Sequence, residues 1–311
     1  MKNQSFVTEF VLLGVSQNPD VQKIVFVIFL LFYIATICGN LLIVAAIISN
    51  PALMGSPMYF FLVFLSFLDA CFISVIGPKM IIDCLYEKKT ISYGGCMMQI
   101  FTGHLFAGAE MIVLTSMAYD RYVAICKPLH YTSIMNSRLC GILIGVAWAG
   151  GFLHSSIQIL FILQLPFCGP NVIDHFVCEL YPLLKLACTD TYAFGLMIVA
   201  NSGFFCILIF FMLLVSYGVI LFSLRNYSTE GKRKALSTCG THVAVVVLFF
   251  LPCIFEYARP PVSFSFDKIV EMFYTILTPL LNPLIYAFRN TEVKNAISKL
   301  CSRLIFVSIE K

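Results

Sequence analysis

The stretch that decides the fold is Met117-Ala-Tyr-Asp-Arg-Tyr-Val-Ala-Ile-Cys126. It places an acid and a base, Asp120 and Arg121, side by side at the end of a long apolar segment. A charge next to hydrocarbon is costly unless it is paired, hydrated or functional, and an adjacent opposite charge offsets part of that cost. The pair by itself indicates a membrane helix that ends at a water interface.

The composition indicates a membrane protein. Of 311 residues, 60% are apolar and 12% are charged, and a soluble protein carries about twice that share of charge. A bilayer span needs about 20 apolar residues. Seven stretches qualify: Ile24–Ser49, Pro57–Leu85, Gly95–Ile125, Arg138–Leu163, Ala193–Asn226, Arg233–Ala258 and Lys268–Phe288. The amphipathic segment Asn290–Arg303 then predicts a short surface helix. The expected fold class is an all-α membrane protein, a seven-transmembrane helix bundle.

An odd number of spans places the two termini on opposite sides of the membrane. With the amino terminus outside, 12 of the 20 Lys and Arg residues fall inside with four acids, as the positive-inside rule favours. The polar stretch before Ile24 argues against a cleavable signal peptide, so the first helix is expected to act as an uncleaved anchor. Asn3-Gln-Ser5 is then a candidate glycosylation site on the outer side. The charge of +4 comes without a basic, aromatic-interleaved block, which argues against nucleic acid as a partner.

Several motifs follow one another at characteristic spacing. They are Pro57-Met-Tyr-Phe-Phe-Leu62, the Asp120-Arg-Tyr stretch, Lys127-Pro-Leu-His-Tyr131, Lys234-Ala-Leu-Ser-Thr-Cys239 and Pro279-Leu-Leu-Asn-Pro-Leu-Ile-Tyr286. Their joint order resembles the olfactory (odorant) receptors, a branch of the rhodopsin-like (class A) G-protein-coupled receptors, from Phe10 to about Asn295. The resemblance implies an extracellular amino terminus (1–23), a seven-transmembrane receptor domain (24–289) and a cytoplasmic tail (290–311).

The resemblance also implies a function. A small, mostly hydrophobic volatile odorant would bind in the outer half of the bundle and activate a stimulatory, olfactory-type G protein that raises cAMP. The chain would not be an enzyme and would need no cofactor. It would lie in the plasma membrane, in the cilia of olfactory sensory neurons. The residues expected to form the switch and the G-protein contact are Asp120, Arg121, Tyr122, Tyr217, Lys234, Ser237, His242, Asn282, Pro283 and Tyr286.

Two acids are expected inside the membrane at similar depth. Glu110 precedes Arg121 by 11 residues, which places it about 16 Å further out on nearly the same helix face. Asp69 lies about halfway through the second span. Two carboxyl groups at one depth repel each other unless one is protonated or a cation lies between them. The resemblance suggests a sodium site made of Asn40, Asp69, Glu110 and Asn282, and a protonated, hydrogen-bonded pair without an ion is the equal alternative.

Four of the 13 cysteines fall on the outer side, namely Cys96, Cys168, Cys178 and Cys188. Four thiols allow three connectivities, and the sequence alone does not choose between them. The resemblance implies Cys96–Cys178 and Cys168–Cys188. His175-Phe-Val-Cys-Glu179 also has the residue types of a soft-metal site, but a disulfide-bonded Cys178 offers no thiolate, so little metal binding is expected.

The ligand pocket is expected between the third, fifth, sixth and seventh helices. His104, Ala107, Gly108 and Met111 share one face of the third helix at i, i+3, i+4 and i+7. The resemblance adds Asn201, Ser202 and Phe205, then Phe250, Cys253, Ile254 and Tyr257, then Met272 and Thr275. These residues are mostly apolar or neutral, which suits an uncharged ligand. Glu256 is an exception near the pocket mouth. Three interpretations are open for Glu256: contact with lipid headgroups, a pair with Arg259, which is favoured, and contact with a polar odorant. A pocket acid would admit basic ligands.

Three other functions compete with this one. In a transporter or proton channel, Asp69, Glu110 and His104 would be relay groups, but such proteins usually carry internal repeats, and the sequence has none. A membrane enzyme would need a metal triad or a nucleophile with its base at one depth, and no such set is evident. The third is a receptor of the same fold for a non-odorant ligand in another tissue, which the sequence does not dismiss.

Overall fold

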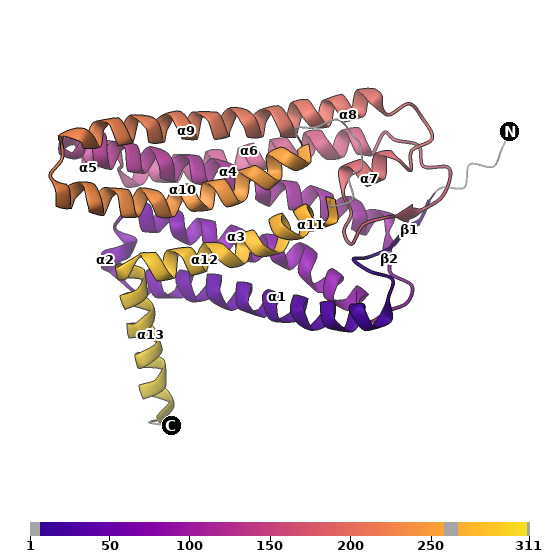
Figure 1. Cartoon of the computed structure of the whole chain (residues 1–311), viewed down its shortest axis with the longest axis horizontal. Coiled ribbons are helices and arrows are strands. Elements are labelled where there is room, and N and C mark those ends of the chain that lie inside the picture. The colour runs from indigo at the N-terminus through magenta and orange to yellow at the C-terminus, as the bar shows by residue number, and fades with distance from the viewer. Residues whose placement is uncertain (1–6, 258–266, 310–311) are drawn as a thin grey trace.

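A computed structural model describes residues 7–257 and 267–309. Its long helices lie side by side in one bundle (Figure 1). Within the described residues, seven helical segments are long and apolar enough to cross a membrane. They are α1 (Pro19–Ile48), α3 (Pro57–Asp83), α4 (Tyr93–Cys126), α6 (Ser137–Ile162), Tyr192–Ser223, α10 (Thr229–Tyr257) and Asp267–Tyr286. The predicted seven-transmembrane helix bundle is therefore confirmed.

Two of the spans contain a wider, π-helical turn. The fifth span consists of α8 (Tyr192–Ile198), the π-helical segment η2 (Val199–Phe204) and α9 (Phe205–Ser223). The seventh consists of α11 (Asp267–Met272), the π-helical segment η4 (Phe273–Leu277) and α12 (Thr278–Arg289). A π-helical turn inserts an extra residue and rotates the helix faces on either side of it, and such turns are frequent at functional sites.

Short elements connect the spans. These are α2 (Pro51–Met54), η1 (Pro128–His130), α5 (Tyr131–Ile134), α7 (Leu180–Leu184) and η3 (Leu224–Asn226). The last helix, α13 (Thr291–Ile309), leaves the bundle at a steep angle to its long axis (Figure 1). It corresponds to the predicted surface helix Asn290–Arg303 and ends later in the chain. Asn290 begins it, because its side-chain oxygen accepts hydrogen bonds from the backbone N–H groups of Glu292 and Val293.

A small three-stranded sheet, which the all-α prediction did not include, closes one end of the bundle. β1 (Glu9–Leu12) pairs antiparallel with β2 (Thr90–Ser92) and parallel with β3 (Val172–Ile173). The sheet joins the amino-terminal segment to two loops that are distant in sequence (Figure 1). Strands of two to four residues carry no readable alternation of polar and apolar side chains, so the sequence pattern does not reveal them.

A proline in the seventh span frees a backbone carbonyl, and a side chain from the first span bonds to it. Pro283 has no N–H, so the carbonyl of Pro279, four residues earlier, loses its usual helical partner. The Asn40 amide, which is fully buried, donates to this oxygen at 3.0 Å. Asn40 therefore holds α1 against the irregular part of α12.

Replacing Asn40 with alanine is expected to destabilise the protein by about 1–3 kcal/mol, because the Pro279 carbonyl is then buried without a partner. The thermal unfolding midpoint of purified protein in nanodiscs measures this loss. Thr278→Val is the companion variant, since the Thr278 hydroxyl donates at 3.3 Å to the Leu248 carbonyl, which Pro252 frees in the same way. Because this hydrogen bond is longer than that of Asn40, Thr278→Val is expected to lower the thermal midpoint by less. An unchanged midpoint for Asn40→Ala would show that the freed carbonyl needs no partner.

Candidate functional site

Two disulfides fasten a long loop over one end of the bundle, which is called the outer end below. Cys96, in the first turn of α4, is bonded to Cys178, with the Cα atoms 5.5 Å apart. Cys168 is bonded to Cys188, with the Cα atoms 5.8 Å apart, which closes the loop on itself. These are the two pairs that the resemblance implied. The Cys178 backbone N–H also donates to the Gln99 side chain at 3.0 Å, so the loop is tied to α4 twice.

A cavity of about 40 Å³, called the outer cavity below, lies directly under this loop. Side chains from the second, third, fourth, fifth, sixth and seventh spans and from the loop contribute to its wall. The lining residues are Phe72, Ile76, Gln99, Ile100, Gly103, His104, Ala107, Met111, His154, Val177, Cys178, Glu179, Ser202, Cys253, Tyr257, Glu271 and Tyr274. Six of the residues expected in a pocket are therefore found together: His104, Ala107, Met111, Ser202, Cys253 and Tyr257.

Seven expected pocket residues do not line the outer cavity, and several of them pack behind it. Gly108 faces α6, where a Cβ atom on it would lie 3.1 Å from the Gly151 Cα atom. Such a close approach of two helices requires small residues on both. Phe250 is fully buried against Phe249 and Phe210, with ring centroids 5.2 Å and 5.8 Å apart. Both residues pack between helices instead of lining the outer cavity, so their pocket role stays a prediction.

The other five expected residues also point elsewhere. Asn201 donates to the His154 carbonyl at 3.3 Å, and Phe205 stacks on the His154 ring at 6.3 Å between centroids. The Thr275 hydroxyl donates to the carbonyl of Glu271 within its own helix at 2.6 Å. The remaining two, Ile254 and Met272, are partly buried and pack against the hydrophobic core.

The outer cavity contains polar residues that the sequence reasoning missed. On the seventh span, Glu271 and Tyr274 take the places expected for Met272 and Thr275. The π-helical turn in η4 explains this shift by one residue. The turn lies between the Pro279–Tyr286 motif and the outer end of the seventh span, and its extra residue changes which side chains face the cavity. Glu179 was also missed, although its place next to Cys178 in the sequence is a direct signal that it lies over the pocket.

Glu179 and Tyr257 form a hydrogen bond at the roof of the outer cavity. The Tyr257 hydroxyl donates to Glu179 Oε1 at 3.1 Å, and the Leu180 backbone N–H donates to Glu179 Oε2 at 2.8 Å. Burial raises the pKa of Glu179, and these two hydrogen bonds oppose that rise. The loop and the outer end of α10 are therefore joined through a buried carboxyl group.

His175 anchors the loop over the outer end of the bundle. Its carbonyl accepts a hydrogen bond from the Gly14 N–H at 3.1 Å, and its ring stacks on Phe176 with centroids 4.6 Å apart. Its Nδ1 atom accepts from the Val177 N–H at 3.4 Å. Within the described part of the chain, no three His, Cys, Asp or Glu side chains gather as a metal site would need.

The burial of His175 predicts an acid-sensitive outer end. Desolvation, with a smaller contribution from the nearby Lys268, lowers the pKa of His175 to about 3. The unfolded chain binds this proton near pH 6.5 and the folded chain only near pH 3, so stability is complete above the higher value and falls as the pH drops between them. We expect the thermal midpoint to fall more steeply from pH 7.5 to 5 in the wild type than in His175→Asn, whose Oδ1 atom can still accept from Val177. Equal slopes would contradict this assignment.

Deeper in the bundle, three buried polar side chains meet. The Asn282 amide donates to Asp69 Oδ2 at 3.0 Å, to Asp69 Oδ1 at 3.2 Å and to Glu110 Oε1 at 3.4 Å. The structure thus brings together three of the four residues of the suggested sodium site. The fourth, Asn40, directs its amide nitrogen to the carbonyls of Thr36 and Pro279 instead.

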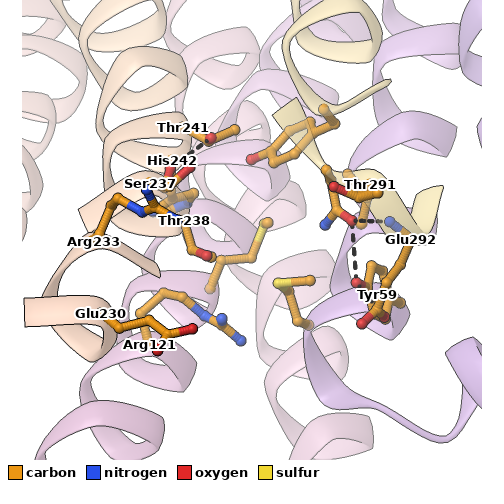
Figure 2. A pocket seen from close by; sticks show the side chains of 15 residues that line it. Tyr59, Arg121, Glu230, Arg233, Ser237, Thr238, Thr241, His242, Thr291 and Glu292 are labelled. Carbon is orange, nitrogen blue, oxygen red and sulfur yellow. Dashed lines mark hydrogen bonds between the residues drawn. The ribbon is translucent and has the colours of Figure 1, made fainter. Parts of the chain in front are cut away.

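At the opposite, inner end the bundle contains a cavity of about 770 Å³, called the inner cavity below and shown in Figure 2. Arg121 from α4 and Glu230, Arg233, Ser237 and His242 from α10 reach toward it (Figure 2). The rest of the wall is Met58, Tyr59, Leu62, Met117, Thr238, Thr241, Tyr286, Asn290, Thr291 and Glu292. Four expected switch residues that are distant in sequence therefore line this one cavity, namely Arg121, Ser237, His242 and Tyr286.

Arg121 is held by its neighbour in the sequence. Its Nε atom donates to Asp120 Oδ2 at 2.9 Å, and a second guanidinium nitrogen bonds the same oxygen. Asp120 is fully buried, and the Tyr131 hydroxyl from α5 donates to its other oxygen at 2.7 Å. Both oxygens of the Asp120 carboxylate therefore have hydrogen-bond partners. The Arg121 guanidinium is held in place and still lines the inner cavity.

The other expected switch residues lie in different surroundings. Tyr217 on α9 is hydrogen-bonded to His242 on α10, and the hydroxyl of Tyr286 is buried without a hydrogen-bond partner in the described structure. Tyr122 stacks its ring on Tyr119 with centroids 6.4 Å apart and does not line the inner cavity, so its switch role stays a prediction. Pro283 is buried in the wall between α12 and α1, where a Cβ atom on Gly39 would lie 3.4 Å from its ring.

Three expectations fall on parts of the chain that the structure does not describe. Asn3, the candidate glycosylation site, and Arg259, the suggested partner of Glu256, both lie outside the described residues. Lys234 lies in α10, but its side chain is not described. Glu256 itself is buried, at 8% exposure.

The fold matches that of rhodopsin-like G-protein-coupled receptors. Squid rhodopsin superposes with a TM-score of 0.72 at 20% sequence identity, and the match covers 91% of this chain and 81% of that one. At this identity the likeness shows the fold. In this fold, Arg121 lies at the inner end of the bundle, and the loop held by the two disulfides lies at the outer end.

The family follows from sequence. The family model described as olfactory receptor matches residues 29–303. Human olfactory receptor 4S2 is 57% identical over 308 residues, covering 99% of this chain and 98% of its own length. Mouse olfactory receptor 4B13 is 54% identical over 297 residues, covering 96% and 97%. The chain belongs to the olfactory receptor family, and it is therefore a multi-pass membrane receptor and not an enzyme.

Proposed function

We propose that this receptor binds a small, mostly hydrophobic volatile odorant in the outer cavity and activates a stimulatory, olfactory-type G protein that raises cAMP. The observation that carries the proposal is the arrangement of two cavities along one helix. α4 contributes His104, Ala107 and Met111 to the outer cavity and Met117 and Arg121 to the inner one. A movement of α4 relative to its neighbours therefore changes both cavities together.

The inner cavity is the docking site for the G protein in this proposal. Its volume of about 770 Å³ is within the range of well-formed binding pockets. The guanidinium of Arg121 and the side chain of Arg233 offer charge-assisted donors to carboxylates and carbonyl oxygens of an entering chain terminus. The proposed orientation, with this end in the cytoplasm and the amino terminus outside, places the large opening on the side where a G protein is found. Expected locations are the plasma membrane and the cilia of olfactory sensory neurons.

The buried carboxyl pair is proposed to hold either one shared proton or one sodium ion. Asp69 and Glu110 share a single amide donor, so a proton or a cation between them relieves their repulsion. The buried Asn282 oxygen, which has no partner in the described structure, would complete an oxygen-rich set around sodium. Basal cAMP signalling in sodium and in choline buffers tests this, with Glu110→Gln as the variant. If the variant keeps the full sodium dependence of the wild type, the ion is excluded.

The direct test of function is an odorant panel applied to cells that express the receptor, an olfactory-type Gα subunit and a cAMP reporter. At least one volatile is expected to raise cAMP in a dose-dependent way, and cells without the Gα subunit are expected to stay silent. A response confined to non-volatile ligands would favour a receptor of the same fold for another kind of signal. Ion flux in liposomes without any G protein would favour the transporter alternative.

A further inference from the structure

The polar wall of the outer cavity contains two buried carboxyl groups beside the Gln99 amide and the hydroxyls of Ser202, Tyr257 and Tyr274. Glu179 and Glu271 both line it, and they are only 7% and 3% exposed. The ion pairs of the described residues include neither of these two carboxyl groups. The Tyr257 hydroxyl already donates its proton to Glu179.

The surroundings supply further negative charge. Among the described residues, the carboxyl groups of Glu179 and Glu256 act electrostatically on Glu271. Lys268, on the same short helix as Glu271, directs its ammonium outward to Asp174 at 2.6 Å and to the Gly14 carbonyl at 3.1 Å. Buried carboxylates without a counter-charge are costly, because the protein interior does not replace the water they lose. A cation brought by the ligand would remove that cost.

His104 is independent evidence that the outer cavity contains a hydrogen-bond acceptor without a donor partner among the described residues. Its side chain is 8% exposed, and its Nδ1 atom lies 3.0 Å from the carbonyl oxygen of Ile100. A carbonyl only accepts, so the proton sits on Nδ1 and the Nε2 atom is left as an acceptor. Nε2 is buried without a partner among the described residues, on a side chain that lines the outer cavity.

We propose that the outer cavity selects small primary or secondary amines in their protonated form. This inference rests on the proposed function, because it names the chemical class of the odorant. An ammonium group supplies several N–H donors and one positive charge, which match Glu271, Glu179 and the Nε2 atom of His104. The alkyl part of the amine lies against the apolar wall formed by Met111, Phe72 and Ile76. A cavity of about 40 Å³ holds a few water-sized groups, which limits the ligand to a few heavy atoms unless the wall moves.

The test compares n-propylamine with 1-propanol, which has the same chain and no charge, on full-length receptor in nanodiscs at pH 7.4. Ligand binding raises the thermal unfolding midpoint by mass action, so the midpoint as a function of concentration gives the affinity. The amine is expected to bind wild-type receptor at least about tenfold more tightly than the alcohol. Glu271→Gln, which keeps the size of the side chain, is expected to remove about a tenfold preference and to leave the alcohol unchanged.

Two further variants separate charge from folding. Glu179→Gln still offers an oxygen to the Tyr257 hydroxyl and is expected to reduce the amine preference in the same way. Glu87→Gln removes an exposed acid from the loop before β2 and is expected to change nothing. Equal affinity for the amine and the alcohol in the wild type, no binding of either, or an undiminished amine preference in both cavity variants would overturn the proposal.

Signalling by the same receptor and ligands in cells separates this inference from the proposed function. If amines bind but raise no cAMP in cells that express an olfactory-type Gα subunit, the proposed function fails and the ligand class stands. If only neutral volatiles raise cAMP, the proposed function stands and the ligand class is wrong.

Discussion

Receptor in which Cys178 is replaced by serine is expected to reach the cell surface at a small fraction of the wild-type level and to lose its ligand response. The bond between Cys178 and Cys96 closes a loop of 82 residues. Loss of that constraint on the unfolded chain costs about 4 kcal/mol, a large part of the stability of a typical domain. The change also loosens the loop that carries Glu179 and closes the outer cavity. Surface immunostaining of unpermeabilised cells, together with the cAMP response, measures both effects.

Two matched variants make this prediction specific. The Cys168–Cys188 bond closes a loop of only 20 residues, so the same model predicts a smaller cost of about 3 kcal/mol for Cys188→Ser. Cys301 is a free, exposed cysteine on α13, and Cys301→Ser is expected to behave as wild type. A Cys178→Ser receptor with normal surface level and normal response would show that the long loop is not held by this bond.

Replacing Arg121 with alanine is expected to abolish ligand-evoked cAMP without weakening ligand binding. Arg121 lines the inner cavity and does not line the outer one. Its loss also leaves Asp120 buried with only the Tyr131 hydroxyl as a partner, so surface expression must be measured alongside the response. Arg138→Ala, at an exposed position in α6, is the control and is expected to signal normally.

Asp120→Asn is expected to act in the opposite direction. Removing the carboxylate charge weakens the hold on Arg121 while preserving the shape of the side chain, so the arginine is released more often. Basal cAMP should rise several-fold when measured at equal surface expression. If both variants lowered signalling equally, the pair would be needed for folding rather than for switching.

The sequence predicted the spans well and their ends less well. Asp20, Gln22 and Lys23 interrupt the apolar run, so the first helix was predicted to begin at Ile24, yet α1 begins at Pro19. The Asn18 side chain accepts hydrogen bonds from the backbone N–H groups of Asp20 and Val21, and this N-cap starts the helix in a polar region. Local capping thus extends the helix beyond the apolar segment.

The candidate site was predictable at the inner end and only partly predictable at the outer end. The inner residues lie in contiguous motifs, so Arg121, Ser237 and Tyr286 could be identified from the resemblance of those motifs to the family. At the outer end, the π-helical turn in η4 changes which residues face inward, and Glu271 was therefore missed. Glu179 depends on a loop whose position follows from a disulfide rather than from periodicity.

The most direct test of coupling between the two cavities is the affinity of one activating ligand with and without the G protein. Thermodynamic reciprocity requires that a ligand that promotes G-protein binding also binds more tightly when the G protein is bound. In nanodiscs with purified receptor, nucleotide-free stimulatory G protein is expected to lower the Kd of the ligand by about 5–150-fold, and Arg121→Ala is expected to remove that difference. An identical Kd in the presence and absence of a saturating G protein would contradict a shared switch between the outer and inner cavities.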